Sequence, residues 1–397
     1  MWARRLLQSC VPALAVLVSL PCAATTIVVN SGEDVEGPPW VGVPSRCAAG
    51  STLPCRMRDA VAAARGGDRI VFAPGITEIA LGRTLKFADA SGLPVTVDGE
   101  GRVSFLPPLG TPTLRMMGPH TNVVVLRGLT IPGARSASGA VAGWDGLDNC
   151  GGAILNQGDL SLERITLPYG FAKFGGLICN FGELRIAQST LTLGQAVFSA
   201  GAIMNLGTLE VTNSLISESS AQVSQRQGNP FNPFWSGAGA VFNRNGTADF
   251  NFVTMYENRG YLDMDRQRLG HSILNACGDL RVRNSVLLPT FGMGLSVGRY
   301  PCFAHPTRVE NSLFALSIQG VELPLPLHWD DGGGNIHSSD TRLVVDAVPC
   351  LDAPATDLRG VPRPQGAACD MGAFEQSFDL FADGFESGAA TAAGGQP

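Results

Sequence analysis

A repeat of 24 or 25 residues constrains the fold of this chain more than any other feature of its sequence. A segment that begins Gly-Gly-Ala-Ile-Leu-Asn at position 151 returns in similar form at positions 175 and 200. Its asparagine recurs with intervals of 24, 25, 38 and 32 residues, at Asn156, Asn180, Asn205, Asn243 and Asn275. The two longer intervals indicate insertions between otherwise equivalent units.

Each unit carries two or three short stretches of alternating apolar and polar residues, separated by glycine and asparagine. A unit of this size cannot bury its apolar face alone, whereas stacked copies share one continuous core. At about 3.3 Å per strand residue, three short strands and their corners fill one turn of a parallel β-helix. The pattern thus predicts an all-β solenoid of about ten turns over residues 68–320. The leucine pattern and helical segments of a leucine-rich repeat, the other solenoid considered, are not found.

The alternation also predicts which side chains face the core and what the asparagines do. Asparagine tolerates the left-handed backbone conformation of a corner, and stacked amides can hydrogen-bond from turn to turn. We therefore expect a structural asparagine column. The inward residues next to it are expected to be Leu160 and Leu162, Leu184 and Ile186, and Leu209 and Val211.

The stretch 55–65 is the best helical segment of the sequence. Met57, Val61 and Ala64 fall on one helix face, and two glycines follow at positions 66 and 67. Because the open end of a solenoid needs a cover, we expect an N-terminal capping helix over the first turn.

The N-terminus has the pattern of a secretory signal peptide. Arg4 and Arg5 precede an apolar run at 11–20 and a small-residue site ending at Ala24. A lipoprotein anchored through Cys22 is the alternative, which Pro21 disfavours, and the run is too short for a membrane span. We expect export, with no membrane span after signal removal. A net charge of -6 without a basic run argues against a nucleic-acid partner.

Eight cysteines follow the signal segment, and an even number in an exported chain indicates disulfides. The alternative, a zinc site, lacks any C-x-x-C pair. Spacing favours two local loops and one bridge between adjacent turns, and elimination leaves a fourth pair. The expected pairs are Cys47–Cys55, Cys350–Cys369, Cys277–Cys302 and Cys150–Cys179.

Three polar segments are candidates for metal binding or catalysis, although no cofactor is expected overall. Asp145, Asp148 and Asn149 offer oxygen ligands of the kind that calcium prefers, with an ordinary Gly/Asp/Asn turn as the alternative. Asp263 and Asp265 lie in an insertion that is more simply interpreted as a solvated loop. The segment 328–337, with two histidines and two aspartates, matches no zinc spacing and is interpreted as a Gly-rich connector.

The 38-residue interval contains an aromatic, proline-rich segment at 229–235. Its rings form a stiff apolar platform that suits stacking on sugars or a protein partner, or else they fold back onto the adjacent turn. The candidate binding residues are Phe231, Phe234 and Trp235.

Three segments resemble known families of bacterial exported proteins. Residues 55–72 resemble the CSLREA-type N-terminal region. The copies at 151–154, 175–178 and 200–203 look like polymorphic outer-membrane protein repeats. Residues 354–375 are similar to the choice-of-anchor Q C-terminal domain, and 378–386 resemble a short terminal motif of gammaproteobacterial exported proteins. The resemblance implies a right-handed parallel β-helix that is usually surface-associated, without an assigned activity.

These observations predict five regions and one principal function. The regions are a signal peptide (1–24), an N-terminal cap (25–67), the β-helix (68–320), a C-terminal closure (321–376) and a terminal motif with a tail (377–397). We expect a secreted or surface-exposed, non-catalytic protein that binds polysaccharide, a cell-surface glycan or a protein. The alternative is a polysaccharide lyase or glycoside hydrolase acting in a groove of the β-helix.

Overall fold

The computed structural model describes most of the chain from residue 24 to residue 376. The described ranges are 24–34, 43–87, 93–108, 112–116, 123–133, 150–222, 238–261, 271–289, 295–297, 306–314, 330–338 and 340–376.

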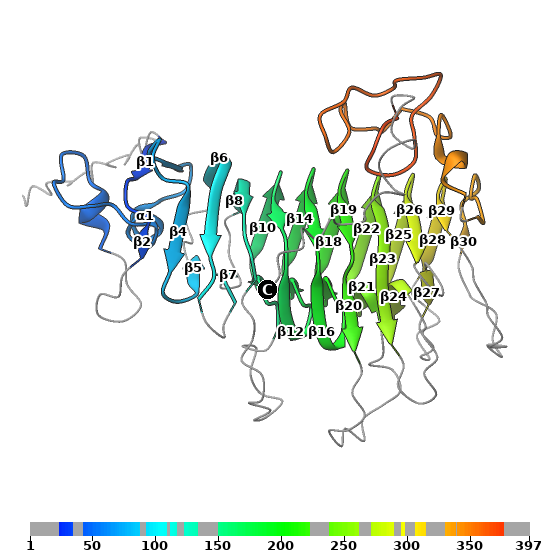
Figure 1. Cartoon of the computed structure of the whole chain (residues 1–397), viewed down its shortest axis with the longest axis horizontal. Helices are drawn as coiled ribbons and strands as arrows, with labels where there is room; N and C mark the ends of the chain where they lie inside the picture. Colours follow the sequence, from blue (N-terminus) through cyan, green and yellow to red (C-terminus); the bar gives the residue numbers. More distant parts are fainter. Residues whose placement is uncertain are drawn as a thin grey trace, which may run out of the picture.

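Successive strands stack in parallel along the long axis of the molecule (Figure 1). The first column of strands runs without interruption from the N-terminal to the C-terminal end. It consists of β1 (Thr26–Val29), β3 (Arg69–Phe72), β6 (Val95–Leu106), β8 (Val123–Thr130), β10 (Asp159–Glu163), β14 (Glu183–Ala187), β18 (Thr208–Thr212), β22 (Thr247–Asn251), β25 (Asp279–Arg283), β28 (Thr307–Glu310) and β30 (Asp330–Asp331).

Three further columns complete the turns. The second, into which β6 and β8 also extend, contains β2 (Glu33–Asp34), β4 (Glu78–Leu81), β11 (Thr166–Leu167), β15 (Thr190–Thr192), β19 (Leu215–Ser217), β23 (Thr254–Tyr261), β26 (Val286–Pro289) and β29 (Leu313–Phe314). The third contains β12 (Gly170–Phe174), β16 (Gly194–Ser199) and β20 (Ser220–Gln222). The fourth contains β5 (Leu85–Phe87), β7 (Leu114–Met116), β9 (Ile154–Asn156), β13 (Ile178–Asn180), β17 (Ile203–Asn205), β21 (Ala238–Arg244), β24 (His271–Ala276) and β27 (Leu295–Val297).

The prediction of an all-β parallel β-helix is therefore confirmed. The stack is longer than the range 68–320, because β1 and β2 pair with β3 and β4 at one end and β30 pairs with β28 at the other. These outlying strands have two to four residues and lie outside the asparagine repeat, so the repeat could not locate them.

The helix α1 (Met57–Ala63) lies at the N-terminal end of the stack, beside β1 and the short 3-10 helix η1 (Pro44–Cys47) (Figure 1). Met57 and Ala60 are fully buried and join the main core, so the helix covers the first turn as predicted. The buried Asp59 fastens the preceding loop, because it accepts hydrogen bonds from the Val43 amide (2.7 Å) and Arg56 Nε (2.8 Å).

Like residues stack inside the solenoid with their strands in register. Leu160, Leu184 and Leu209 are aligned across β10, β14 and β18, and all are at most 1% exposed. The same holds for the neighbouring Leu162, Ile186 and Val211. Burying one such side chain contributes roughly 1.5–3 kcal/mol, and each turn adds several.

The repeated asparagines form one continuous ladder inside the fourth column. Each side-chain amide nitrogen donates to the side-chain oxygen of the next asparagine, over distances of 2.7–2.8 Å from Asn156 to Asn275. The last of them, Asn275, donates to the hydroxyl of Thr307 at 2.9 Å. All five side chains are at most 2% exposed, so the structural role predicted for this column is confirmed.

A second polar ladder, which the repeat analysis missed, follows the corner between the first and second columns. Ser214 Oγ accepts from the Ser189 amide, and Ser312 Oγ accepts from the Ser285 amide, both at 3.1 Å. The residue before each serine adopts a left-handed backbone, with φ of 50° at Asn213. This corner turns within a few residues because the serine supplies a hydrogen bond that the bent backbone lacks.

Glycine is required where consecutive turns touch between the third and fourth columns. A Cβ at Gly201 would collide with the backbone of Gly239 and Ser220 in the next turn. The same collision recurs one turn earlier at Gly176, against Gly201 and Gln195. The repeated glycines therefore set how closely the turns approach.

Replacing Asn205 with alanine should lower the free energy of unfolding by about 2–4 kcal/mol, because it removes the buried ladder bonds to Asn180 and Asn243 and the hydrogen bond to the Thr247 carbonyl. The matched control is Thr208→Ala, which removes an exposed side chain from the same turn. Urea unfolding of the two variants measures the difference. Equal stabilities would contradict the role of the ladder.

The N-terminal cap should lose stability in acid. Burial works to raise the pKa values of Asp59 and Asp68, but hydrogen bonds to Arg56 and Val43, and to Arg65 and Thr25, outweigh it and lower both pKa values below 3.8. A lowered folded-state pKa stabilises the fold above about pH 4 and loses that contribution as the pH falls through the lowered value. The protection of the α1 amides against hydrogen exchange, taken relative to the intrinsic exchange rate at each pH, should therefore fall below about pH 4.

Asp68→Asn should reduce this pH dependence, whereas Glu78→Gln, at an exposed carboxylate of β4, should leave it intact. A cap whose protection relative to the intrinsic exchange rate is the same at pH 3 and pH 6 would refute the assignment.

Candidate functional site

The predicted binding and metal residues lie outside the described part of the chain. This applies to Asp145, Asp148 and Asn149, to Phe231, Phe234 and Trp235, and to Asp263 and Asp265. Calcium binding and the aromatic platform accordingly stay predictions. Among the described residues, no group of three histidine, cysteine or acidic side chains is placed to hold a metal.

The cysteines form the predicted local pairs. Cys47–Cys55, Cys150–Cys179 and Cys350–Cys369 are disulfides. Cys277 is disulfide-bonded as well, and Cys302, its expected partner, lies outside the described residues. The second of these bridges connects the turn before β9 to β13 and lies in an apolar cluster separate from the main core.

The described part of the polar segment 328–337 has structural contacts. Asp331 accepts hydrogen bonds from the Gly333 amide (2.9 Å) and from Asn335 Nδ2 (2.7 Å). Asp330 lies 3.5 Å from Arg308, and the ring of His337 packs edge-on against Phe314. These contacts fit a structural connector, since β30 is the last strand of the first column and Ile336, which follows it, pairs in parallel with Leu313 of β29.

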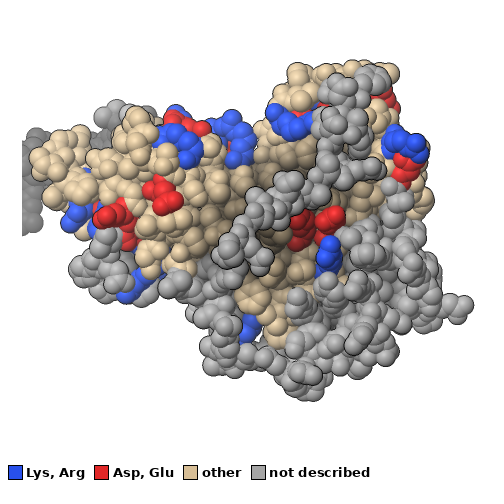
Figure 2. Space-filling view, viewed as in Figure 1, with Lys and Arg blue, Asp and Glu red and all other residues tan. Residues whose placement is uncertain are grey.

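The outer face of the first column is a network of ion pairs between turns. Arg185 bonds Asp159 on the previous strand at 2.7 Å, and Arg281 bonds Glu310 on the next at 2.6 Å. Figure 2 shows basic and acidic side chains in small mixed groups on the face it draws, within a mainly uncharged surface. Exposed pairs of this kind contribute little stability each, but they remove any single-signed patch from the described face.

Two neighbouring carboxylates interrupt the pairing of acidic with basic side chains on this face. Glu210 on β18 is in register with Asp249 on β22, so the two lie about one strand spacing of 4.8 Å apart. Asp249 is also bonded by Arg283 at 3.1 Å, whereas Glu210 is exposed. The pair is the part of the described surface that most resembles the acids of a sugar-cleaving site.

The corner between the second and third columns carries an exposed apolar stripe. Tyr169 and Leu193 precede the paired residues Gly170 and Gly194 on consecutive turns, and they are 43% and 45% exposed. Phe171 follows on β12, half-buried, and alternates with the inward Ala172. We call Tyr169, Phe171 and Leu193 the aromatic corner.

Residues 340–376, here called the C-terminal module, pack on the flank of the solenoid, above β19 to β30 in Figure 1. The outward residues of the second column change where the module lies. Thr166 and Thr190 occupy the position on β11 and β15, whereas Thr254, Val286 and Leu313 occupy it under the module and are at most 6% exposed. Valine and leucine add apolar contact there, and Thr254 Oγ1 accepts a hydrogen bond from the Ala373 amide at 2.9 Å.

The corner residues with left-handed backbone receive the module. Asn213 donates to the Thr356 carbonyl at 2.8 Å, and the Asn284 carbonyl accepts from Gly372 at 2.7 Å. The guanidinium of Arg363 stacks 4.9 Å from the ring centre of Phe252. The residues of this one corner therefore both turn the backbone of the solenoid and bind the module.

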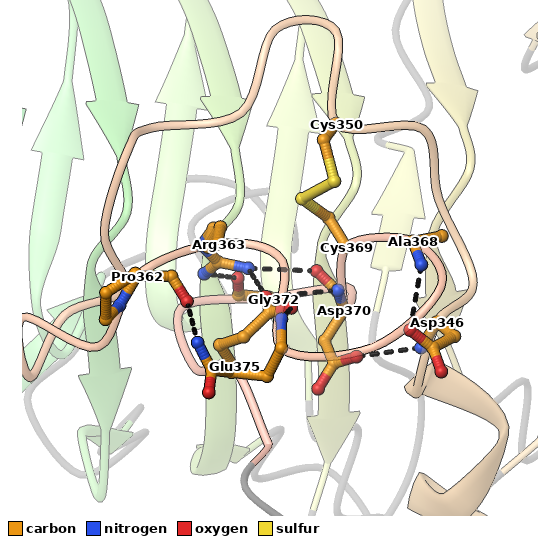
Figure 3. Close-up of a disulfide and its surroundings, with 10 residues drawn as sticks. Asp346, Cys350, Pro362, Arg363, Ala368, Cys369, Asp370, Gly372 and Glu375 are labelled. Carbon is orange, nitrogen blue, oxygen red and sulfur yellow. Dashed lines mark hydrogen bonds and ion pairs between the residues drawn. A yellow bond between two sulfur atoms is a disulfide. The ribbon is translucent and has the colours of Figure 1, made fainter.

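Arg363 is the centre of a buried ionic cluster inside the module. Its side chain is 1% exposed and lies 2.8 Å from Glu375, which is fully buried. Figure 3 shows Arg363 pointing toward Asp370 and Gly372, whose carbonyls it bonds at 3.2 and 2.8 Å, beneath the Cys350–Cys369 bridge. In residues 354–375, nearly every side chain that can ionise is therefore used to hold the module together.

The carboxyl groups of this cluster respond to their surroundings in opposite directions. Burial raises the pKa values of Asp370 and Glu375. Burial also acts to raise the pKa of Asp357, but hydrogen bonds from the Glu375 amide and Arg359 outweigh it, and that pKa is lowered. Protonation of Asp370 and Glu375 stabilises the module as the pH falls, because their pKa values are raised in the fold, whereas protonation of Asp357 destabilises it, because its pKa is lowered. The module is therefore not expected to unfold in a single acid transition.

An apolar cavity of about 120 Å³ lies at the seam between the module and the solenoid. Tyr256 and Leu288 line it from β23 and β26, and Met371, Phe374 and Gln376 line it from the module. No sequence pattern indicated this cavity, because its two walls come from segments about a hundred residues apart.

Comparisons with known proteins add a remote likeness of fold. No family model and no curated protein matches the chain. A solved structure of pectate lyase Pel9A matches at 13% identity with a TM-score of 0.47, covering 90% of this chain and 97% of that chain. A match at this level says nothing about activity. Within the described residues, no helix is long and apolar enough to cross a membrane.

Replacing Arg363 with methionine should destabilise the module by about 3–5 kcal/mol, because Glu375 is left buried without its counter-charge. The module should then become sensitive to protease while the solenoid stays protected. Arg342→Ala, which removes an exposed ion pair with Asp340, is the control and should leave the protease resistance of the module nearly unchanged. A module that resists cleavage equally in both variants would contradict the importance of the cluster.

Proposed function

We propose that the chain is exported, loses residues 1–24, and serves outside the cell as a non-catalytic module that binds polysaccharide. The observation that carries this proposal is the aromatic corner, where Tyr169 and Leu193 expose apolar surface on consecutive turns. Rings on the outside of a β-sheet are suited to stacking on the apolar faces of sugars. Tyr169 and Leu193 lie about one strand spacing of 4.8 Å apart, and the exposed Glu218 occupies the same corner position on the next turn.

Two further features support the proposal. Disulfides persist in oxidising compartments, in agreement with the signal-like residues 1–24. The segment with Phe231, Phe234 and Trp235 adds a second group of rings in the insertion that follows β20. The resemblance of residues 354–375 to a domain of surface-associated proteins agrees with an extracellular location.

A polysaccharide lyase or glycoside hydrolase is the second candidate, and one observation favours it. Glu210 and Asp249 are in register on adjacent strands, whose backbones lie about 4.8 Å apart, so their carboxyl groups can approach the separation of about 5 Å between the two acids of retaining glycosidases. Arg283 forms an ion pair with Asp249 at 3.1 Å, beside the exposed Glu210. In such an enzyme, Glu210 would act as the acid and Asp249 as the nucleophile.

One assay separates the two functions. The mature chain is incubated with acidic and neutral polysaccharides, with calcium or with chelator, and both retention and product formation are measured. Tyr169→Ala should weaken retention roughly 5- to 20-fold, the equivalent of about 1–2 kcal/mol of stacking. The control is Leu351→Ala, at a residue of the module that is 90% exposed.

Equal retention by the two variants would reject the aromatic corner as the binding surface. New reducing ends that disappear in Glu210→Gln would replace the binding function with the enzymatic one.

A further inference from the structure

The row of corner residues that begins with Tyr169 and Leu193 continues into two carboxylates. Strand register aligns Leu193 with Glu218 and Glu218 with Glu257 on successive turns, each about 4.8 Å from the last. Leu193, Glu218 and Glu257 share a left-handed backbone, with φ of 54°, 52° and 54°. Because stacked residues of one conformation direct their side chains alike, apolar and acidic side chains leave the same edge of the solenoid. We call these four residues the corner row.

The two glutamates of the corner row have no counter-charge. On the first column, Asp159 is bonded by Arg185 at 2.7 Å. By contrast, neither Glu218 nor Glu257 forms an ion pair with a described residue, and both are exposed. The one basic residue of β23, Arg259, pairs on the third column and also forms no ion pair with a described residue. The corner row therefore ends in two unneutralised negative charges.

The phenol of Tyr256, which directly precedes Glu257 on β23, responds to both carboxylates. Burial raises the pKa of Tyr256, a hydrogen bond with Ser217 opposes the rise, and the negative charges of Glu218 and Glu257 add to it. Both glutamates are thus close enough to act on one group. A cation placed at this end of the corner row would interact with the two of them together.

We propose that the corner row binds a polysaccharide of amino sugars with free amines, whose rings pack on Tyr169 and Leu193 while its ammonium groups bond Glu218 and Glu257. This inference rests on the proposed polysaccharide binding and names the class of ligand. An ammonium group donates three hydrogen bonds, whereas the carboxylate of an acidic sugar would be repelled by the two glutamates. The net charge of -6 adds long-range attraction for a cationic glycan.

The test compares glucosamine oligomers with N-acetylglucosamine oligomers of the same length, because acetylation removes the positive charges and keeps the rings. Calorimetric titration of the mature chain at about pH 5.5 keeps the sugar amines protonated and the glutamates ionised. The glucosamine oligomer should bind roughly 5- to 20-fold more tightly at about 0.01 M salt, the effect of two exposed charge pairs. This preference should shrink at about 1 M salt, where screening is strong.

Variants locate the preference on the corner row. Glu218→Gln combined with Glu257→Gln should abolish it. The matched control combines Glu33→Gln with Glu78→Gln, which changes the net charge equally at two exposed carboxylates of β2 and β4, and should retain it. Tyr169→Ala should weaken the binding of both oligomers alike.

The outcomes separate this inference from the proposed function. Equal affinity for the two oligomers, with both weakened by Tyr169→Ala, would overturn the cationic ligand and leave the polysaccharide binding intact. A preference that survives the double glutamate variant would also overturn it. Tighter binding of an oligogalacturonate that is lost in Arg259→Ala would assign the surface to acidic glycans instead. If no glycan binds, the inference and the proposed function fail together.

Discussion

The buried asparagine ladder is the interaction on which the rest of the structure depends. The strands that carry it are short, three residues in β9, β13 and β17, and backbone pairing over so few residues specifies register weakly. An amide in the core must find partners, since leaving it without a hydrogen bond costs about 1–3 kcal/mol. Each side chain meets that need through nearby backbone groups and through the asparagine of the next turn, which must lie directly beside it for the ladder bond to form. The ladder therefore sets the register of every turn from β9 to β24, and the hydrophobic stacks follow from it.

The position of the C-terminal module follows from a local change on that regular frame. The outward position of the second column is threonine on β11 and β15 and valine and leucine on β26 and β29, so the last turns offer an apolar flank to the module. The module is too small for a large core of its own and instead closes around a buried ionic cluster and one disulfide. Arg363 belongs to both parts, because it neutralises Glu375 within the module and stacks on Phe252 of the solenoid.

Residue patterns predicted the fold, but they predicted only part of the candidate sites. The asparagine and glycine positions, the inward pairs such as Leu160 and Leu162, and the helix at 57–63 follow from periodicity within a window of one turn. The serine ladder also has a local signal in the sequence, since Asn-Ser recurs at 213, 284 and 311. The aromatic corner had none, because Tyr169 and Leu193 become neighbours only when two turns align.

The sequence by itself determined the repeating turn, because each turn needs the same buried amide, the same small residues and the same alternation. It also specified the cysteine pairs that close short loops, since proximity along the chain implies proximity in space. Only the tertiary structure decided that the C-terminal module docks on the flank of the solenoid, that Glu210 meets Asp249, and that a cavity opens beside Gln376. Those features arise where segments distant in sequence pack together, and their contacts depend on the number of turns between them, which no single repeat encodes.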